Sequence, residues 1–334
     1  MAFAVKKGTG MAETFLVADI GGTNARFALS RSVGPLQLEA IRQLRTADFS
    51  SPVEAVCAYL QDVNATITHA CMAVAGPRSG QRVTMTNASW DFEIHQVADA
   101  LEFTALHILN DFEALAFGTE HVNQDELICV CAGSPDGTAP VLVTGPGTGL
   151  GQAILLREAG QSRVVATQAG YVSFAPQDEM QREIHGLLRK VTPRVHNEHI
   201  LSGNGLLSLY KAFCEVEGKD RLLSTQEEVT QSGVAGRDET ALATLRLFCR
   251  IMGQVAGDAV LASGARGGVR LAGGILPRLP DILLAGDFAA GFANKAPMEN
   301  YLASVPVHLV TAENTGLLGA SAWLRQLTEN GSWQ

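Results

Sequence analysis

The chain has 334 residues, which is long for a single hydrophobic core and therefore favours two domains. Its 25 basic and 34 acidic residues give a formal net charge of −9, which counts against a nucleic-acid-binding protein that works through a broad basic surface. A small anionic ligand is not excluded, because it needs only local positive potential. Hydrophobic residues make up 46% of the chain, as in an ordinary soluble globular protein.

The N-terminal residues show no targeting signal. Lys6 and Lys7 are not followed by an apolar stretch of the kind that a signal peptide carries, and residues 1–13 have the composition of a loose leader in which Met11 is an alternative start. No segment approaches the uninterrupted apolar length of a membrane span, so we expect no membrane association.

The six cysteines show no CxxC zinc spacing. We expect buried free thiols in a reducing compartment, with a metal or redox site as the alternative. They are Cys57, Cys71, Cys129, Cys131, Cys214 and Cys249.

The first part of the chain predicts strands that alternate with helices. Residues 15–29 read as a strand, a tight glycine turn and a returning strand, and Ser51 and Pro52 open a helix. The further strands are expected at 36–44, 66–75, 82–86 and 105–109, and the helices at 51–63, 94–101 and 113–118. This alternation indicates an α/β architecture.

A second sheet is predicted to begin near residues 126–131. Its further strands are expected at 140–144, 152–157, 269–272 and 305–310. Helices are expected at 180–191, 203–217, 238–261, 277–284, 288–292 and 316–327. The helix at 238–261 is long and amphipathic, and its apolar face is formed by Leu242, Leu245, Phe248, Cys249, Met252, Val255 and Ala259.

The turn at Gly21-Gly22-Thr23-Asn24 follows the first predicted strand directly after Asp19 and Ile20. Two glycines permit φ > 0 and let a bulky anion approach the backbone amides. The threonine hydroxyl and the amides can hold phosphate oxygens, and the acid can hold Mg²⁺ or its water. An ordinary hairpin is the alternative for this stretch taken alone.

A similar glycine-threonine turn recurs at residues 145–151. Residues 22–29 can be laid against residues 147–154, so that Thr23 and Thr148 lie 125 residues apart, about the length of a domain. One such turn in each half suggests two similar domains that face one cleft, and chance similarity of glycine-rich turns is the alternative.

Asn110 and Asp111 stand at the end of the strand predicted at 105–109. Open α/β sheets place ligands beyond the carboxyl ends of their strands. A carboxylate there can accept the proton of an alcohol that attacks phosphorus, and the asparagine can fix a second hydroxyl. A helix cap by Asp111 ahead of Phe112 is the alternative. GxxxxGK[ST], GxGxxG, HExxH and GxSxG do not occur, which disfavours P-loop kinases, dinucleotide enzymes, zincins and common serine hydrolases.

Eight short motifs occur in a fixed order over residues 15–328: Asp19-Ile-Gly-Gly-Thr-Asn-Ala-Arg26, Met85-Thr-Asn87 with Trp90, Leu109-Asn-Asp-Phe112, Gly145-Pro-Gly-Thr-Gly-Leu-Gly151, Phe174-Ala-Pro176, Leu201-Ser-Gly203, Ala272-Gly-Gly-Ile275 and Gly316-Leu-Leu-Gly319. Together they resemble the bacterial ATP-dependent glucokinases of the proteobacterial type.

The resemblance implies a two-lobed α/β fold of the actin-like (ribonuclease H-like) type, with a ligand cleft between the lobes. The smaller domain would comprise residues 14–119 plus 315–330, and the larger domain residues 120–314. It also implies a cytoplasmic homodimer that uses ATP and Mg²⁺ to phosphorylate a sugar hydroxyl, converting glucose to glucose 6-phosphate in glycolysis.

The resemblance further implies a role for each matching residue. Asp111 would be the catalytic base, and Asp19 would steer Mg²⁺ through water. The phosphates and the adenosine would be held by Asp19, Gly21, Gly22, Thr23, Asn24, Gly147, Thr148, Gly149, Gly273 and Gly274. The sugar would be held by Asn87, Asn110, Asp111, Gln168, Tyr171 and Glu198.

Residues 168–176 depart from the family pattern. The family usually carries Glu-Gly-Gly-His-x-Asp-Phe-Ala-Pro, whereas this chain has Gln168-Ala-Gly-Tyr171-Val-Ser173-Phe-Ala-Pro176. Gln168 keeps an acceptor oxygen but loses the negative charge, and Tyr171 keeps a polar tip on a bulkier body. Because an unpaired buried hydroxyl costs roughly 1–3 kcal/mol, another hexose, an amino sugar or a keto-sugar acid is the alternative substrate.

A non-catalytic sugar sensor is the alternative from a different functional class. The retained Asp111 and the lack of an appended helix-turn-helix or basic arm count against it. His196 and His199 flank Glu198, and we expect them to form the surroundings of the site rather than a metal centre.

Overall fold

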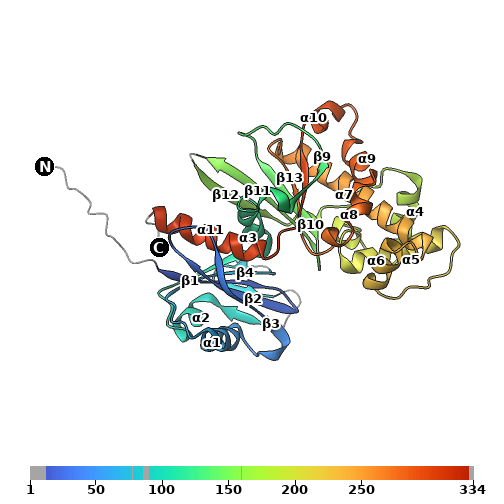
Figure 1. The fold of residues 1–334 in the computed structure, drawn as a ribbon. Helices are drawn as coiled ribbons and strands as arrows, with labels where there is room; N and C mark the ends of the chain where they lie inside the picture. The colour runs from blue at the N-terminus through green and yellow to red at the C-terminus, as the bar shows by residue number, and fades with distance from the viewer. Residues whose placement is uncertain (1–12, 77, 86–89, 159, 331–334) are drawn as a thin grey trace. The chain divides into compact units, whose positions relative to one another are not determined.

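The computed structural model describes residues 13–76, 78–85, 90–158 and 160–330 (Figure 1). The described chain forms two compact units: unit 1 contains the residues up to His121 together with those from Asn314 onward, and unit 2 contains Val122–Glu313. Each unit has its own sheet and its own hydrophobic core.

Unit 1 is built on a five-stranded sheet with the order β3-β2-β1-β4-β8. β1 runs antiparallel to β2, which runs antiparallel to β3, whereas β1, β4 and β8 are mutually parallel. The strands are β1 (Thr14–Ile20), β2 (Asn24–Arg31), β3 (Leu38–Arg45), β4 (His69–Val74) and β8 (Ala105–Asn110). β1 lies in the middle of this sheet, which explains why its sequence is apolar at nearly every position.

Alternate residues of β1 enter two different cores. Leu16 and Ala18 contact the core that α1 (Pro52–Val63) and α2 (Ile94–Ala100) complete, whereas Phe15 and Val17 contact the core completed by α3 (Asp111–Gly118) and α11 (Thr315–Asn330). The last helix of the chain therefore belongs to the unit that holds the first strand (Figure 1).

α3 and α11 touch through their backbones. A Cβ added at Gly118 would lie 1.9 Å from the Thr315 carbonyl oxygen, and one at Gly319 would lie 1.7 Å from the Ala114 carbonyl oxygen. Glycine is required at both positions, since any side chain would force the two helices apart. A small sheet of β5 (Arg78–Ser79), β6 (Arg82–Thr84) and β7 (Asp91–Glu93) completes unit 1.

Unit 2 is built on a six-stranded sheet with the order β12-β11-β10-β13-β14-β9. Its strands are β12 (Gln161–Thr167), β11 (Leu150–Glu158), β10 (Val141–Pro146), β13 (Gly268–Leu271), β14 (Val307–Val310) and β9 (Leu127–Cys131). The first five repeat the order and directions of the unit 1 sheet: two antiparallel pairs are followed by two parallel pairs. The two glycine-threonine turns occupy equivalent places, between β1 and β2 and between β10 and β11.

The helices of unit 2 are α4 (Glu179–Leu188), α5 (Gly203–Val216), α6 (Gln226–Val234), α7 (Glu239–Ser263), α8 (Pro280–Leu284), α9 (Asp287–Ala293) and α10 (Glu299–Ala303). α7 supplies much of the core, because the apolar face predicted from its sequence is buried: Leu245, Phe248, Cys249, Met252 and Val255 are each at most 8% exposed. Leu242 and Ala259 are partly buried against the same core.

α7 and α9 cross in direct backbone contact. A Cβ added at Gly253 would lie 2.1 Å from the Phe288 carbonyl oxygen, and one at Gly291 would lie 2.1 Å from the Arg250 carbonyl oxygen. This crossing fixes the position of α9 against the long helix.

Some expectations were wrong or incomplete. β12, α6 and α10 were not predicted. The cysteines are free thiols, but Cys57 and Cys129 are exposed rather than buried, since Cys57 lies on the outer side of α1 and Cys129 lies on β9, an edge strand. Among the described helices, none is both long and apolar enough to cross a membrane.

Candidate active site

The turn between β1 and β2 is held from β3. The Gly21 N–H donates to the Asn24 carbonyl at 2.9 Å, the Thr46 hydroxyl donates to the Gly21 carbonyl at 3.0 Å, and the Thr46 N–H donates to the Thr23 carbonyl at 3.0 Å. Thr46 is buried, whereas Thr23 is exposed and leaves its hydroxyl available to a ligand. Neither Gly21 nor Gly22 has a positive φ, so the turn does not use the conformational freedom that the two glycines permit.

Asp19 is the penultimate residue of β1 and lies next to this turn. Its side chain is 27% exposed, and one carboxylate oxygen lies 3.8 Å from an Arg26 guanidinium nitrogen. Burial raises the pKa of Asp19, and the Arg26 charge opposes that shift. At the start of α11, Gly316 makes room for this carboxylate, since a Cβ there would lie 3.0 Å from Asp19 Oδ2.

Asn110 and Asp111 join β8 to α3. Asn110 is the N-cap: its side-chain oxygen accepts from the Phe112 N–H at 3.1 Å, and Glu113 accepts from the Asn110 N–H at 3.3 Å. The alternative in which Asp111 caps the helix is therefore wrong, because the extended strand continues to Asn110 and Asp111 is the first helical residue.

The carboxyl of Asp111 has a raised pKa of about 6. Burial is the largest cause, and the negative charge of Asp19 adds to it. Hydrogen bonds from the Phe112 N–H, at 2.9 Å, and from the Asn110 side chain oppose the shift. Unit 1 thus brings together two carboxylates and an exposed turn hydroxyl.

In unit 2, the equivalent turn follows β10. The Gly147 N–H donates to the Gly149 carbonyl at 2.8 Å, and the Gly147 carbonyl accepts from the N–H of Gly203, the first residue of α5, at 2.9 Å. Thr148 is exposed at the tip. This turn is thus attached to the N-terminus of a helix, where backbone N–H groups favour anions.

The glycine pair after β13 lies against the same turn. A Cβ added at Gly147 would lie 3.9 Å from the Gly274 nitrogen, and one at Gly273 would lie 2.7 Å from the Pro146 carbonyl oxygen. Gly273 has φ of 89°, so glycine is required there by conformation as well as by space. The structure therefore brings the 147–149 and 273–274 turns together.

Glu198 lies beside the same turn, in a 3₁₀ segment, Asn197–His199. Its Oε2 accepts from the Leu150 N–H at 2.8 Å. A Cβ at Gly149 would lie 2.3 Å from this oxygen and a Cβ at Gly170 would lie 3.4 Å from it, so both glycines leave room for the carboxylate. Ser202, the N-cap of α5, donates from its hydroxyl to the Glu198 carbonyl at 2.8 Å.

Tyr171 pairs with this carboxylate. The Glu198 charge is the largest cause that raises the pKa of Tyr171, followed by burial and by the hydrogen bond between the two side chains. The Tyr171 ring lies 4.9 Å, centroid to centroid, from the His196 ring, and its carbonyl accepts from Arg194 at 3.0 Å. Tyr171 is 46% exposed, and Gln168, at the start of the same segment, is exposed as well.

The histidines beside Glu198 form a stacked pair rather than a ligand set. The rings of His196 and His199 lie 3.6 Å apart, and His199 Nδ1 accepts from the His196 N–H at 3.2 Å. Over the described ranges, no group of three or more His, Cys, Asp or Glu side chains is arranged to hold a metal ion.

Asn87 lies outside the described residues. Three further residues shape the site: Thr46 holds the first turn, Gly316 makes room for Asp19, and Gly170 makes room for Glu198. Gly316 was part of a recognised motif, but its role requires contact with a residue almost three hundred positions away. Nothing in the sequence marked Thr46 as a residue of the site, because a buried threonine next to a strand can serve many structural roles.

Comparisons with known proteins identify the family of the chain. A family profile described as Glucokinase matches residues 16–327. A glucokinase of Marinobacter nauticus is 42% identical over 92% of this chain and 95% of its own length, and one of Chromohalobacter salexigens is 43% identical over 93% and 97%. The crystal structure of a glucokinase from an Antarctic psychrotroph is 37% identical, with a TM-score of 0.84 over 94% of this chain and 99% of that one. The fold is thus the actin-like α/β fold of the sugar kinases, and the chain belongs to the glucokinase family.

Proposed function

We propose that the protein is an ATP-dependent sugar kinase that converts glucose to glucose 6-phosphate. Its membership of the glucokinase family supports a sugar kinase. The observation that carries the chemistry is Asp111: a carboxyl at the end of a parallel strand, with a pKa of about 6, has the basicity that a proton acceptor needs near neutral pH.

In the proposed reaction, Asp111 accepts the proton of the sugar hydroxyl while that oxygen forms a bond to the γ-phosphorus of ATP. The bond from the γ-phosphorus to the β–γ bridging oxygen breaks, and ADP leaves with its electron pair. The side-chain oxygen of Asn110 serves the helix cap and its NH₂ donates one hydrogen to Asp111, so the second N–H of this NH₂ is left for a sugar hydroxyl.

The glycine turns are proposed to bind the nucleotide. The N–H groups of Gly21 and Gly147 close the two turns, and the residues that follow them in each turn would offer backbone N–H groups to phosphate oxygens. Thr23 and Thr148 add exposed hydroxyls. Gly273 and Gly274 would accept the adenosine end, because glycines without Cβ atoms let a flat ligand approach the backbone. Such donors stabilise the charge that develops on the transferred group.

Asp19 fits a magnesium ion. It is a partly exposed carboxylate with a pKa raised by burial. Its negative charge also raises the pKa of a second carboxylate, Asp111. A divalent cation held there through water would offset this repulsion. When bound, Mg²⁺ would neutralise charge on the β- and γ-phosphates.

The sugar is proposed to contact Glu198 and Tyr171 in addition to Asn110 and Asp111. Glu198 is oriented by the Leu150 N–H and by the Tyr171 hydroxyl, so it presents its remaining acceptor positions in a fixed direction. Gln168 offers both a donor and an acceptor from an exposed position. Asn87 is also proposed as a sugar-binding residue.

The identity of the sugar is tested by a coupled assay of ADP formation with glucose, other hexoses, amino sugars and keto-sugar acids. Glucose turnover is the expected result. Turnover of a different sugar would assign the change to Gln168 and Tyr171, which replace the family's usual Glu and His. Sugar binding without ADP formation would show a sensor and contradict catalysis.

We also propose, from the family resemblance, a homodimer that works in glycolysis in the cytoplasm. The domains proposed to act on the substrates are residues 14–119 plus 315–330 and residues 120–314. Light scattering after gel filtration tests the oligomer: a mass near 35 kDa instead of twice that value would contradict the dimer.

A further inference from the structure

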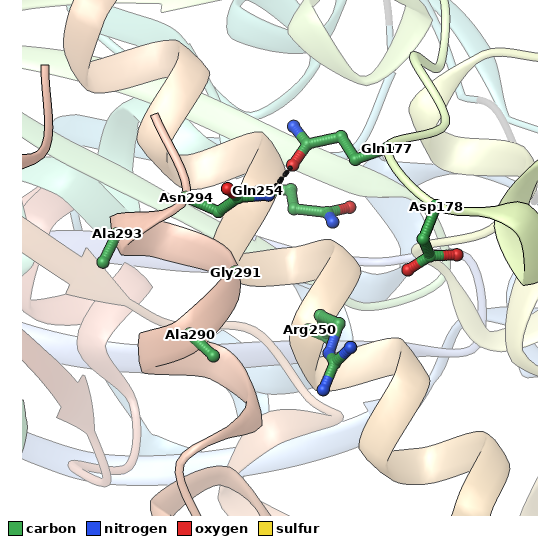
Figure 2. Close-up of a pocket in the computed structure, with 8 residues that line it drawn as sticks. All are labelled: Gln177, Asp178, Arg250, Gln254, Ala290, Gly291, Ala293 and Asn294. Atoms are coloured by element: carbon green, nitrogen blue, oxygen red, sulfur yellow. Dashed lines mark hydrogen bonds between the residues drawn. The ribbon is translucent and has the colours of Figure 1, made fainter. Parts of the chain in front are cut away.

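Unit 2 contains a pocket that is lined by none of the residues assigned to the nucleotide or the sugar. Its volume is about 470 Å³, which is ample for a small organic molecule. α7 contributes Arg250 and Gln254, α9 and its C-cap contribute Ala290 and Asn294, and the segment before α4 contributes Gln177 and Asp178 (Figure 2).

The pocket follows from the close crossing of α7 and α9. Because Gly253 and Gly291 allow backbone contact, the small side chains of α9 leave open space beside the crossing. The Asn294 amide NH₂ donates to the Gln177 side-chain oxygen at 3.0 Å, and this bond, drawn in Figure 2, ties α9 to the segment before α4.

The charged groups of the pocket already have partners. Arg250 donates to Asp287 Oδ1 at 3.1 Å. The two Asp178 oxygens accept from the Gln181 N–H at 2.9 Å and from the Gln181 side-chain amide at 3.0 Å. The Arg250 charge is thus balanced by Asp287. The remaining N–H groups of Arg250 and the remaining acceptor positions of Asp178 stay open to hydroxyl groups.

The amide of Gln254 lacks such a partner. Gln254 is 4% exposed, and within the described part of the chain its enclosed side-chain oxygen has no hydrogen-bond partner. Figure 2 shows its side chain among the other lining groups, between Asn294 and Asp178. Rotation about the last torsion of a glutamine is broad, so either its oxygen or its NH₂ can be turned toward a ligand.

We propose that this pocket binds a small uncharged polyhydroxy compound, a monosaccharide or a polyol. A hydroxyl group both donates and accepts, which matches the side-chain amides of Gln254, Asn294 and Gln177. The alanines of α9 provide a small apolar surface for the carbon skeleton. The lining residues are not among those proposed for catalysis, so this proposal can be tested independently of the kinase activity.

The test is a binding titration by calorimetry and ligand-observed NMR. The probes are glucose, myo-inositol and glycerol, with inorganic phosphate and glutamate as charged probes. The variants are Gln254→Leu, which keeps the side chain's size, and Ala290→Leu, which fills the pocket from an exposed helix position. Gln231→Leu, an exposed glutamine of α6 in the same unit, is the matched control, and circular dichroism checks that all variants fold.

The expected result is a polyol site in the wild type that both pocket variants weaken about tenfold or more and the control leaves unchanged. The sugar KM and kcat should stay unchanged in all three. Absence of a second glucose site and of myo-inositol binding would overturn the proposal while leaving the kinase assignment intact. Preference for phosphate or glutamate would overturn the ligand class. If Gln254→Leu abolishes polyol binding while the wild-type protein shows no kinase turnover, the proposed pocket is supported and only the proposed function is contradicted.

Discussion

Two opposing influences meet at Asp111. The first position of a helix usually favours an ionised carboxylate, because free N–H groups and the helix dipole attract negative charge. Here burial and the neighbouring Asp19 outweigh that attraction, and the pKa rises to about 6. At neutral pH the group is still mostly ionised, yet it is more basic than an exposed aspartate, as a proton acceptor requires.

This pKa predicts how activity depends on pH. We expect kcat/KM for the sugar to rise with pH around a midpoint near 6 and then to level off, because only the ionised Asp111 accepts a proton. Asp111→Asn should lower kcat by about 10²- to 10⁴-fold with little change in the KM for ATP. Asp99→Asn, at an exposed position of α2, is the control. Wild-type turnover in Asp111→Asn would show that the base is another group.

The same group predicts a gain of stability on substitution. The folded-state pKa of about 6 lies above the ordinary aspartate pKa of 3.8, so the ionised form destabilises the folded state and the penalty grows as pH rises through this interval. Asp111→Asn should therefore raise the free energy of unfolding at pH 7.5 by about 1–2 kcal/mol, after allowance for partial exposure. Below about pH 4 the aspartate is protonated in both states, and the gain should vanish. Denaturant unfolding at pH 3.5 and 7.5 measures it, and an equal gain at both pH values would contradict the assignment to ionisation.

The turn between β10 and β11 contains two glycines with different surroundings, and we expect one to affect mainly sugar binding and the other mainly ATP binding. Gly149 faces the Glu198 carboxylate, with a hypothetical Cβ 2.3 Å from its oxygen, whereas a Cβ at Gly147 would make only an ordinary contact, 3.9 Å from the Gly274 nitrogen. We expect Gly149→Ala to displace Glu198 and raise the KM for the sugar more than the KM for ATP. Gly147→Ala should instead raise mainly the KM for ATP. Steady-state kinetics with each substrate varied distinguishes the two, and identical profiles would contradict the separation of roles.

The crossing of α7 and α9 predicts a second contrast between glycines. Gly253→Ala places a Cβ 2.1 Å from a backbone oxygen of α9, and we expect a loss of about 1–3 kcal/mol through overpacking. Gly186→Ala, in α4, meets nothing within 4 Å and should gain about 0.5–1 kcal/mol through helix propensity. Urea unfolding compares them, and equal effects would mean that the close crossing does not govern stability.

The elements that the sequence predicted are those with a strong apolar pattern. β1 is apolar throughout because it is central, and α7 shows its period because one face enters the core. β12 was missed because it lies at a sheet edge with alternate residues exposed or half-buried, and α10 is a five-residue helix without a period to detect. Prediction fails where burial, and therefore patterning, is weak.

The candidate site shows the same limit. Asp19, Asp111 and the glycine turns could be named from the sequence because each lies at the end of a predicted strand. The pairing of Tyr171 with Glu198 could not be inferred, because it joins residues far apart in the sequence through contacts that only the folded unit supplies. The hydrogen bonds by which Thr46 holds the first turn could not be inferred either, because they join Gly21 and Thr23 to a residue beyond the next strand.

The two units of the molecule have separate cores, and they contribute differently to the fluorescence and circular dichroism signals. The three tryptophans are Trp90, Trp323 and Trp333, and residues 122–313 contain none. Tryptophan fluorescence therefore reports on unit 1, whereas circular dichroism in the far ultraviolet is dominated by the long helices of unit 2.

This difference allows the two cores to be tested independently. Leu324→Ala, in the buried face of α11, should cost about 2–5 kcal/mol and shift the fluorescence transition to lower denaturant. Leu245→Ala, in the core of unit 2, should shift the dichroism transition and leave fluorescence less affected. Coincident shifts in both variants by both probes would show that the cores unfold as one cooperative structure.

The membership of α11 in unit 1 bears on the order of events during translation. Unit 2 is one continuous segment, Val122–Glu313, whereas unit 1 needs Thr315–Asn330 to cover the sheet face that carries Phe15 and Val17. On the ribosome, unit 2 can complete its core while unit 1 still exposes that apolar face. The nascent chain is then a target for a chaperone that recognises apolar strands, and binding should end when α11 emerges from the exit tunnel. Ribosome-bound chains stalled before and after residues 315–330 have left the tunnel would reveal this switch by protease sensitivity of β1.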